Sequence, residues 1–290
     1  ADWVTELSVV CRGYVLSVPT FLDIMIPDLF QIGSFRVGTY GVLLVIAIGV
    51  GLWWAQKRAF QFGADPNQLL NMVGWLVFPG ILGARILFVA QEWDYYSRNA
   101  DQLWSLRFDG LTSFGGFLGG FIGFWIWSIV KRQPMLPYAE AMAAPLLVAN
   151  GIGRIGCFLN GCCFGVATQS PFGVHFHGTP GTNLPSQLLE TVLCFFFAWV
   201  LVRIEKTGGL RLGQSVGLAF ALLGLSRFIY EFTRAGSVEE VRRQLASSTR
   251  IPGLPITEAH LVALALIVAG LTYVLVRRRA PLATEPAAKS

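Results

Sequence analysis

Residues 112–130 read TSFGGFLGGFIGFWIWSIV and contain no charged side chain. A helix of about 20 such residues spans the hydrocarbon core of a lipid bilayer. Six more stretches of the chain have a similar length and a similar apolar character, so the sequence predicts an all-α, polytopic membrane protein of about seven transmembrane helices. The predicted spans are residues 35–55, 69–90, 112–130, 137–157, 188–204, 213–233 and 257–276.

The composition agrees with this fold class. The 290 residues are 54% hydrophobic and 13% charged, whereas soluble domains carry about 25% charged residues. These values exclude a water-soluble globule and a disordered chain, and five cysteines are too few for a disulfide framework. The formal net charge of +5 comes mostly from basic residues beside apolar spans, so we expect no nucleic-acid partner.

Basic residues follow the first, third, fifth and seventh predicted spans, which places them on one side of the membrane. By the positive-inside rule this side is the cytoplasm, which predicts a periplasmic N-terminus and a cytoplasmic C-terminus. The loop 234–256 runs against the pattern, because it carries arginines on the opposite side. The basic groups are Lys57 and Arg58; Lys131 and Arg132; Arg203, Lys206 and Arg211; and Arg277 to Arg279.

Three regions are expected along the chain. Residues 1–34 are a periplasmic or interfacial segment, because prolines and aspartates interrupt their apolar stretch. Residues 35–279 form one seven-helix transmembrane domain. They show no convincing internal repeat, which argues against a transporter built from inverted halves. Residues 280–290 are expected to be a disordered cytoplasmic tail.

Several charged residues lie within or beside the predicted spans, where each costs about 2.5–3.5 kcal/mol at a helix centre. Arg227 and Glu231 are four residues apart and can pair on one helix face. Arg154 has no such local partner and must find an anion elsewhere. Residues near span ends can instead extend to the interface. The set is Arg85, Arg154, Glu190, Arg227, Glu231 and Arg234.

Arginine in such a setting indicates phosphate binding, because its planar guanidinium binds phosphate oxygens bidentately and stays charged. The abundant phosphates near a membrane protein are phospholipid headgroups. Arginines converging from different helices would therefore hold phosphatidylglycerol or another anionic phospholipid. Many membrane proteins bind lipid in this way without acting on it.

Residues 151–165, GIGRIGCFLNGCCFG, contain five glycines around Arg154 and Asn160. Each glycine costs an isolated helix about 1 kcal/mol relative to alanine. Glycines are favourable where backbones approach closely or where a helix breaks to line a cavity. Helix packing alone would explain these glycines but not the embedded Arg154 and Asn160. For the second glycine cluster, in residues 115–123, helix packing is a sufficient explanation.

The chain resembles the prolipoprotein diacylglyceryl transferase family at several motifs in the same order. The family signature Gly-Arg-x-Gly-Asn-Phe-x-Asn-Gly is similar to Gly153-Arg-Ile-Gly-Cys-Phe-Leu-Asn-Gly161. The element Arg-Phe-x-x-Glu-Phe-x-Arg is matched in full by Arg227-Phe-Ile-Tyr-Glu-Phe-Thr-Arg234. Weaker matches are Leu184-Pro-Ser-Gln-Leu-Leu-Glu190, Arg36-Val-Gly-Thr-Tyr-Gly41 and Gly83-Ala-Arg85.

The resemblance implies transfer of a diacylglyceryl group from phosphatidylglycerol to the lipobox cysteine of a prolipoprotein, in the bacterial inner membrane and without a cofactor. A protein thiol attacks a glyceryl carbon, and glycerol phosphate leaves. Carried over by motif, the residues expected in catalysis are Arg154, Arg227 and Glu190. Those expected in substrate binding are Tyr40, Arg85, Asn160, Gly165, Glu231 and Arg234.

The chain also departs from the family pattern. The histidine proposed as the family's base is replaced by Gly115, and a second histidine by Leu184. Cys157 stands at the signature asparagine and Cys162 at an acidic position. These substitutions keep an alternative open, namely an inactive lipid-binding relative that serves as a subunit of a larger membrane complex. A transporter or redox protein with the same fold is a further alternative.

Two histidines and three clustered cysteines could have other roles, as a replacement base or as ligands of a metal ion. His175 and His177, in the loop 161–187, are candidate replacement bases. The spacing Cys-x4-Cys-Cys is not typical of zinc or iron–sulfur sites, so we expect no metal site. Buried cysteines usually act as small hydrophobic residues, and Cys11 and Cys194 are expected to be structural. The aromatic residues of 112–130 face either lipid or a protein partner: Phe117, Phe121, Phe124, Trp125 and Trp127.

Overall fold

The structure is a computed structural model that describes residues 26, 28–32, 35–99 and 112–280. A helix forms at each of the seven predicted spans. These helices are α1 (Thr39–Ala59), α2 (Pro66–Gln91), α4 (Ser113–Lys131), α5 (Met135–Leu159), α6 (Ser186–Lys206), α7 (Gln214–Phe232) and α9 (Glu258–Val276). In the described residues six helices are long and apolar enough to cross a membrane, and the apolar helix Gly115–Lys131 is shorter. The predicted all-α membrane fold is confirmed.

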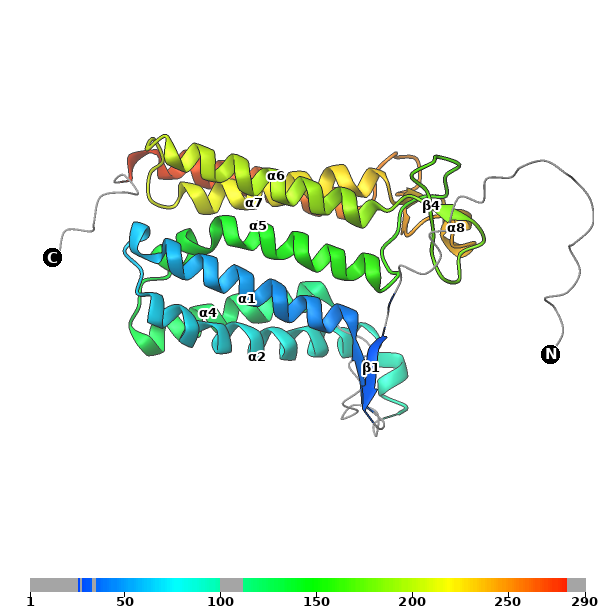
Figure 1. Ribbon diagram of the computed structural model, residues 1–290, viewed down its shortest axis with the longest axis horizontal. Coiled ribbons are helices and arrows are strands. Elements are labelled where there is room, and N and C mark those ends of the chain that lie inside the picture. The colour runs from blue at the N-terminus through cyan, green and yellow to red at the C-terminus, as the bar shows by residue number, and fades with distance from the viewer. Residues whose placement is uncertain (1–25, 27, 33–34, 100–111, 281–290) are drawn as a thin grey trace, which may run out of the picture.

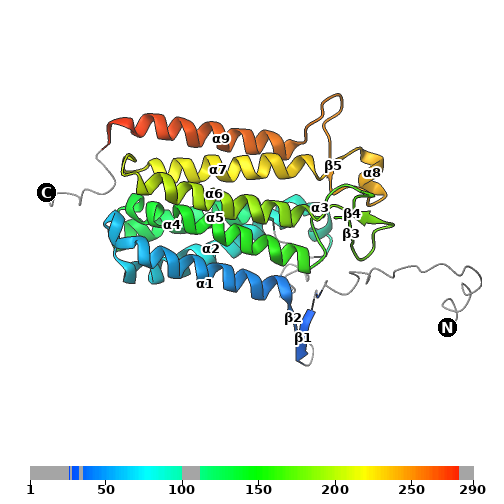
Figure 2. The same ribbon diagram turned by 45° about the horizontal axis from the view of Figure 1, so that its top comes forward.

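The seven helices run alongside one another as an elongated bundle (Figures 1 and 2). Helix α5 lies in the middle of Figure 1, with α6 and α7 above it and α1, α2 and α4 below it. The closest neighbours are α2 with α4, α7 with α9, and α5 with both α1 and α6. Helix α5 therefore joins the two halves of the bundle, and its residues contact both.

The first predicted span begins four residues too early. Residues Phe35–Gly38 form strand β2, which pairs antiparallel with β1 (Asp28–Ile32), and α1 begins at Thr39. Gly38, in an extended conformation, is the last residue of the strand and the N-cap of the helix. Residues 1–25 and 281–290, expected to be interfacial and disordered respectively, lie outside the described part of the chain.

Short elements cover one end of the bundle, which we call the site end (Figure 1). Between α5 and α6 the chain forms the hairpin of β3 (Val174–His175) and β4 (Thr182–Asn183). Between α7 and α9, β5 (Ala235–Gly236) pairs in parallel with β6 (Ser248–Thr249), and α8 (Val238–Arg242) lies between them in sequence. The other short helices in the described residues are η1 (Phe60–Phe62), α3 (Trp93–Tyr96) and η3 (Arg277–Arg279).

Glycines bring α2 and α4 into backbone contact. A Cβ atom on Gly115 would lie 2.7 Å from the carbonyl carbon of Gly83 and 2.8 Å from Cα of Ala84. A Cβ atom on Gly123 would similarly lie 2.9 Å from the carbonyl carbon of Trp75. Real side chains do not fit at such distances, so the expectation that this glycine cluster packs helices together is confirmed.

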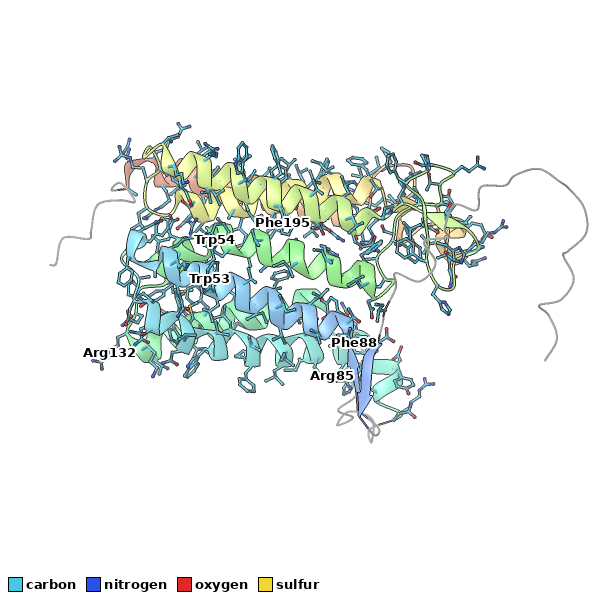
Figure 3. All side chains as sticks on the ribbon, viewed as in Figure 1. Trp53, Trp54, Arg85, Phe88, Arg132 and Phe195 are labelled. Carbon is cyan, nitrogen blue, oxygen red and sulfur yellow. The ribbon has the colours of Figure 1, made fainter. Side chains whose placement is uncertain are left out.

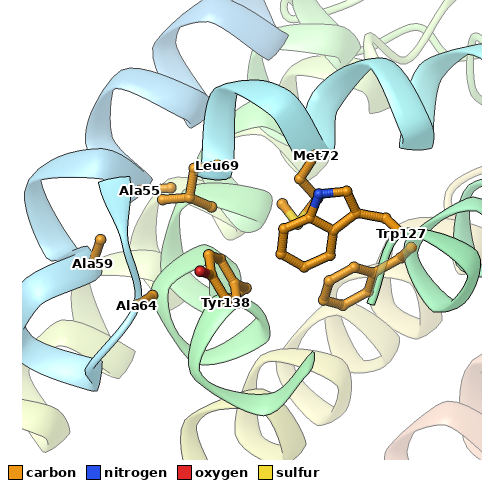
Figure 4. Packing of buried hydrophobic residues seen from close by; sticks show 8 residues of the cluster. Ala55, Ala59, Ala64, Leu69, Met72, Trp127 and Tyr138 are labelled. Atoms are coloured by element: carbon orange, nitrogen blue, oxygen red, sulfur yellow. The ribbon is translucent and has the colours of Figure 1, made fainter. Parts of the chain in front are cut away.

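A hydrophobic cluster lies between α1, α2, α4 and α5 (Figure 4). Trp127 is fully buried there and makes an edge-to-face contact with Tyr138, with 4.8 Å between ring centroids. Phe124 stacks on Trp127 and is also buried. The sequence prediction that both aromatics face lipid or a partner is therefore wrong, because α4 turns this face toward the core. Phe117, Phe121 and Trp125 are exposed as predicted.

At the end opposite the site end, Arg58 is buried. Its guanidinium lies 2.8 and 2.9 Å from the two carboxylate oxygens of Glu205 on α6. It also donates to the backbone carbonyls of Glu140 and Ala141 on α5. Each of the three guanidinium nitrogens donates at least one hydrogen bond, and the bidentate pair links α1, α5 and α6.

Candidate active site

Three guanidinium groups surround one tyrosine ring at the site end. The central carbon atoms of the Arg154, Arg227 and Arg234 guanidinium groups lie 5.1, 4.8 and 5.2 Å from the ring centroid of Tyr230. Arg154 comes from α5, whereas Arg227 and Tyr230 lie on α7 and Arg234 follows its end. Cation–π attraction lets a buried aromatic ring hold several cations close together. Two helices far apart in sequence thus place three positive charges at one point.

Two buried carboxylates lie among these arginines. Glu190 on α6 has Oε2 2.7 Å from Nε of Arg154 and 4.0 Å from a guanidinium nitrogen of Arg227. Glu231 has Oε2 3.1 Å from Arg227 and 3.6 Å from Arg234. The predicted Arg227–Glu231 pair is confirmed, and Glu190 is the distant anion that Arg154 required. Each arginine has a carboxylate neighbour, and three positive and two negative side chains give the cluster a net charge of +1.

The arginines and the carboxylates differ in accessibility. Side-chain exposure is 2% for Glu190 and 0% for Glu231, but 28% for Arg227 and 19% for Arg154. In addition, Nε of Arg234 is buried and has no hydrogen-bond partner among the described residues. The carboxylates therefore orient the guanidinium groups from within, while the outer faces of those groups remain open to an anion.

Tyr40 and Asn160 lie at the two termini that meet beside this cluster. The Tyr40 ring packs on the backbone of α5, with Cδ2 3.3 Å from the position that a Cβ atom on Gly156 would take. Asn160 is the C-cap of α5, where its N–H donates to the carbonyl of Gly156 over 2.9 Å, and its side chain is exposed. Both roles in substrate binding remain predictions.

Gly165 allows a loop to pass close to two helix ends. A Cβ atom at this position would lie 2.6 Å from the carbonyl oxygen of Thr233 and 2.9 Å from Cβ of Leu184. Its N–H donates to Leu184 O, and its carbonyl accepts from the Asn183 side chain. These close contacts are with the protein's own backbone and side chains, and the expected role of Gly165 in substrate binding remains a prediction.

Arg85 lies on α2, at the end of the helix nearest β1 (Figure 3). Its guanidinium sits 5.4 Å from the Tyr96 ring centroid and 6.0 Å from that of Phe88. The contacts that define the arginine cluster come from α5, α6 and α7, whereas the ring contacts of Arg85 come from α2 and α3. A role for Arg85 in substrate binding stays a prediction.

His175 and His177 flank a buried aromatic residue in the β3–β4 hairpin. Phe176 is fully buried and contacts the rings of Phe158 and Phe164 at 6.0 and 5.3 Å between centroids. Because neighbouring side chains of an extended segment point to opposite sides, the two exposed imidazoles point away from that core. His175 Nδ1 lies 3.0 Å from the carbonyl oxygen of Gly181.

Three cysteines gather beside the arginines. The Sγ atoms of Cys157, Cys162 and Cys163 all lie within 4.8 Å of one another. Hydrogen bonds from the Cys157 and Cys162 thiols, together with the charges of Arg234 and Arg154, lower the pKa of Cys163 far below its usual range. The spacing of these cysteines in the sequence did not indicate such a cluster, because it forms only when the chain turns back after α5.

Sequence reasoning missed the residues that support this site from α7 and α9. Tyr230 lies three residues after Arg227 and four before Arg234, a helical spacing that could have indicated it. Thr257 Oγ1 donates to Glu231 Oε1 over 3.2 Å. His260 is buried, accepts from Thr257 N–H over 3.0 Å and lies against Phe228 and Phe232. These two positions carried no local signal.

The position of the family histidine is sterically closed. Gly115 presses against Gly83 and Ala84 of α2 at distances that exclude even a Cβ atom. An imidazole at this position would force α2 and α4 apart. The replacement of histidine by glycine therefore goes together with the close packing of these two helices.

The sequence matches known proteins over most of its length. Residues 27–276 match the family described as prolipoprotein diacylglyceryl transferase. The chain is 28% identical to a protein of Clostridium tetani named phosphatidylglycerol–prolipoprotein diacylglyceryl transferase. This similarity extends over 219 residues, which cover 72% of this chain and 86% of the relative. A protein of that name in Staphylococcus haemolyticus is 27% identical over 274 residues, which cover 89% of this chain and 90% of the relative. A third protein of that name, from Clostridioides difficile, is 30% identical over 209 residues, which cover 72% of this chain and 83% of the relative. Together with the matched motifs now gathered at one end of the bundle, this places the chain in the prolipoprotein diacylglyceryl transferase family.

Proposed function

We propose that this multi-pass membrane protein transfers a diacylglyceryl group from phosphatidylglycerol to the lipobox cysteine of a prolipoprotein, the first step of lipoprotein maturation. The family and the names of the relatives support this activity. They do not favour the alternative of an inactive lipid-binding subunit. The matching location is the bacterial inner membrane, with the site end toward the periplasm.

The observation that carries the proposal is the arrangement of Arg154, Arg227 and Arg234 around Tyr230. The cluster keeps one positive charge beyond its two carboxylates, and it has a buried donor without a partner at Arg234 Nε. A phosphodiester carries one negative charge and offers oxygens that accept from several guanidinium groups. The headgroup of phosphatidylglycerol therefore matches both the charge and the donors of this site.

The reaction needs stabilisation of a departing phosphate. The acceptor sulfur forms a C–S bond with the terminal glyceryl carbon, the C–O bond to the phosphate breaks, and its electron pair leaves with glycerol phosphate. The thiol proton is transferred to the departing phosphate. Because negative charge grows on the phosphate as the bond breaks, the guanidinium groups bind the transition state more strongly than the ground state.

The buried carboxylates act on the arginines and hold their geometry. Glu190 fixes Arg154 from α6, and Glu231 lies between Arg227 and Arg234. Thr257 donates to Glu231 and so keeps that carboxylate in place. Such fixed charges need no reorganisation when the reaction occurs, which is the main advantage of a preorganised site.

A transfer assay in nanodiscs tests the function. Labelled phosphatidylglycerol is supplied with a lipobox peptide that has a single cysteine, and release of glycerol phosphate is measured. We expect peptide-dependent release that falls about 10²–10³-fold in Arg154→Ala. The matched control is Arg242→Ala, since this arginine is 75% exposed and pairs only with the surface residue Glu239 among the described residues. Arg154-dependent lipid binding without any release would instead establish the inactive lipid-binding relative.

A further inference from the structure

The cluster of three thiols beside the arginines has no role in the chemistry described so far. Cys157 is buried in the last turn of α5, and Cys162 and Cys163 are partly buried in the turn that follows. No disulfide joins them, and their Sγ atoms lie within 4.8 Å of one another. Three sulfur atoms this close together can bind the same metal ion.

The backbone of this turn is held so that the sulfurs converge. Gly161 and Cys163 both have positive φ, +71° and +64°, which reverses the chain directly after the helix. Such a conformation is unfavourable for cysteine and persists only where the surroundings fix it. The Cys163 carbonyl accepts from Tyr230 Oη over 3.1 Å, and the Cys162 carbonyl accepts from the Gln187 side chain. The turn is therefore preorganised by α6 and α7.

The spacing of the sulfurs matches a thiolate-bound metal ion. With Zn–S bonds of about 2.3 Å, two ligands of a tetrahedral zinc ion lie ~3.8 Å apart. The three Sγ atoms, which lie within 4.8 Å of one another, are close to this spacing. Adjacent cysteines form only a strained disulfide with each other, whereas both can bind the same ion. Three protein ligands leave one coordination position open, as in catalytic zinc sites.

The charges around the cluster also suit such a site. Zn²⁺ with three thiolates carries one net negative charge. Arg154 and Arg234 act electrostatically on Cys163, so a complex at these sulfurs lies in the field of two positive side chains. Coulomb attraction to these arginines favours an anionic zinc–trithiolate complex over a cationic one.

We propose that Cys157, Cys162 and Cys163 bind one zinc ion whose open position takes the acceptor thiol of the prolipoprotein. This revises the expectation of no metal site, and its second half rests on the proposed function. Zinc would hold the acceptor as a thiolate, so the thiol proton would go to water rather than directly to the departing phosphate. The sulfur held there would then be the nucleophile that forms the C–S bond as the C–O bond to phosphate breaks. The ion would thus supply the thiolate in a chain that has Gly115 at the position of the family histidine.

The first experiment measures metal in the full-length protein, purified in detergent with reductant and without chelator. We expect about one zinc per chain, and cobalt in its place should give the strong near-ultraviolet absorption of Co–thiolate bonds. Cys157→Ser, Cys162→Ser and Cys163→Ser should each lose most of the metal and this absorption. Cys194→Ala is the matched control, since this buried cysteine lies on α6 beside Asn150 and Ser226, and it should keep both.

The second experiment adds the lipobox peptide to the cobalt-loaded protein. We expect the thiolate absorption to rise with the cysteine peptide and not with its serine analogue. Zinc-free protein with three unmodified thiols, or a native disulfide among them, would overturn the metal site whatever the transfer assay shows. Metal bound with no spectral response to the peptide would overturn the acceptor role alone. Metal and response without glycerol phosphate release would overturn the proposed transfer and leave the site in place.

Discussion

Arg154 Nε lies 2.7 Å from Oε2 of Glu190, which joins the fourth predicted span to the fifth by a nearly buried ion pair. The same carboxylate oxygen lies 4.0 Å from Arg227, so one glutamate orients arginines of two different helices. The pair thus explains how a bilayer protein retains Arg154 at low energetic cost. It also fixes the group that would face the lipid phosphate.

Removing this carboxylate should cost stability as well as activity. In Glu190→Ala the Arg154 guanidinium loses its buried partner, and we expect the free energy of unfolding to fall by about 3 kcal/mol. Unfolding in mixed detergent micelles measures the change. Glu239→Ala removes an exposed partner of Arg242 and Arg243 and should change stability by less than about 1 kcal/mol. Equal effects of the two substitutions would contradict a structural role for Glu190.

Tyr230 should act through its ring more than through its hydroxyl. Tyr230→Phe keeps the surface on which the three guanidinium groups rest and loses only the hydrogen bond to Cys163 O. Tyr230→Leu loses the cation–π contacts, each worth about 0.5–2 kcal/mol. We expect phosphatidylglycerol binding to fall at least tenfold more in the leucine variant, measured by lipid co-purification and by titration. Similar losses in both variants would show that the hydroxyl matters instead.

The contact between α2 and α4 should tolerate a side chain at Gly116 but not at its neighbour Gly115. Gly115→Ala places a methyl group against Gly83 and Ala84, and overpacking of this kind costs about 1–3 kcal/mol. Gly116→Ala is the control, because its Cβ atom would lie 3.8 Å from Cβ of Ala84, an ordinary contact. Thermal unfolding compares the two. A Gly115→His variant as stable as the parent would disprove the steric exclusion of the family histidine.

We expect the two histidines of the β3–β4 hairpin to be dispensable for transfer activity, because both are exposed. Both imidazoles are exposed and lie opposite the buried Phe176. We expect the double variant His175→Ala, His177→Ala to keep transfer activity within about twofold, as for surface substitutions elsewhere. The pH profile of the rate is the decisive measurement. Loss of activity together with a changed pH profile would identify one of them as the replacement base.

Hydropathy and charge along the sequence were enough to predict the helices and the embedded arginines. Each span is a sum of local transfer free energies, so it needs no knowledge of neighbours. The predicted boundaries agree with the helices to within a few residues, except at the first span, where Phe35–Gly38 pairs as a strand. The i to i+4 pair of Arg227 and Glu231 is equally local and was predicted for that reason.

Only the tertiary structure decided which distant groups meet. The pairing of Arg154 with Glu190, the three guanidinium groups around Tyr230 and the convergence of Cys157 with Cys162 and Cys163 depend on how α5, α6 and α7 pack at one end. The same holds for Trp127, an apolar residue that suits lipid and core equally well until the packing of α4 buries it. Burial and pairing are properties of interfaces between helices, and hydropathy along one helix does not specify its neighbour.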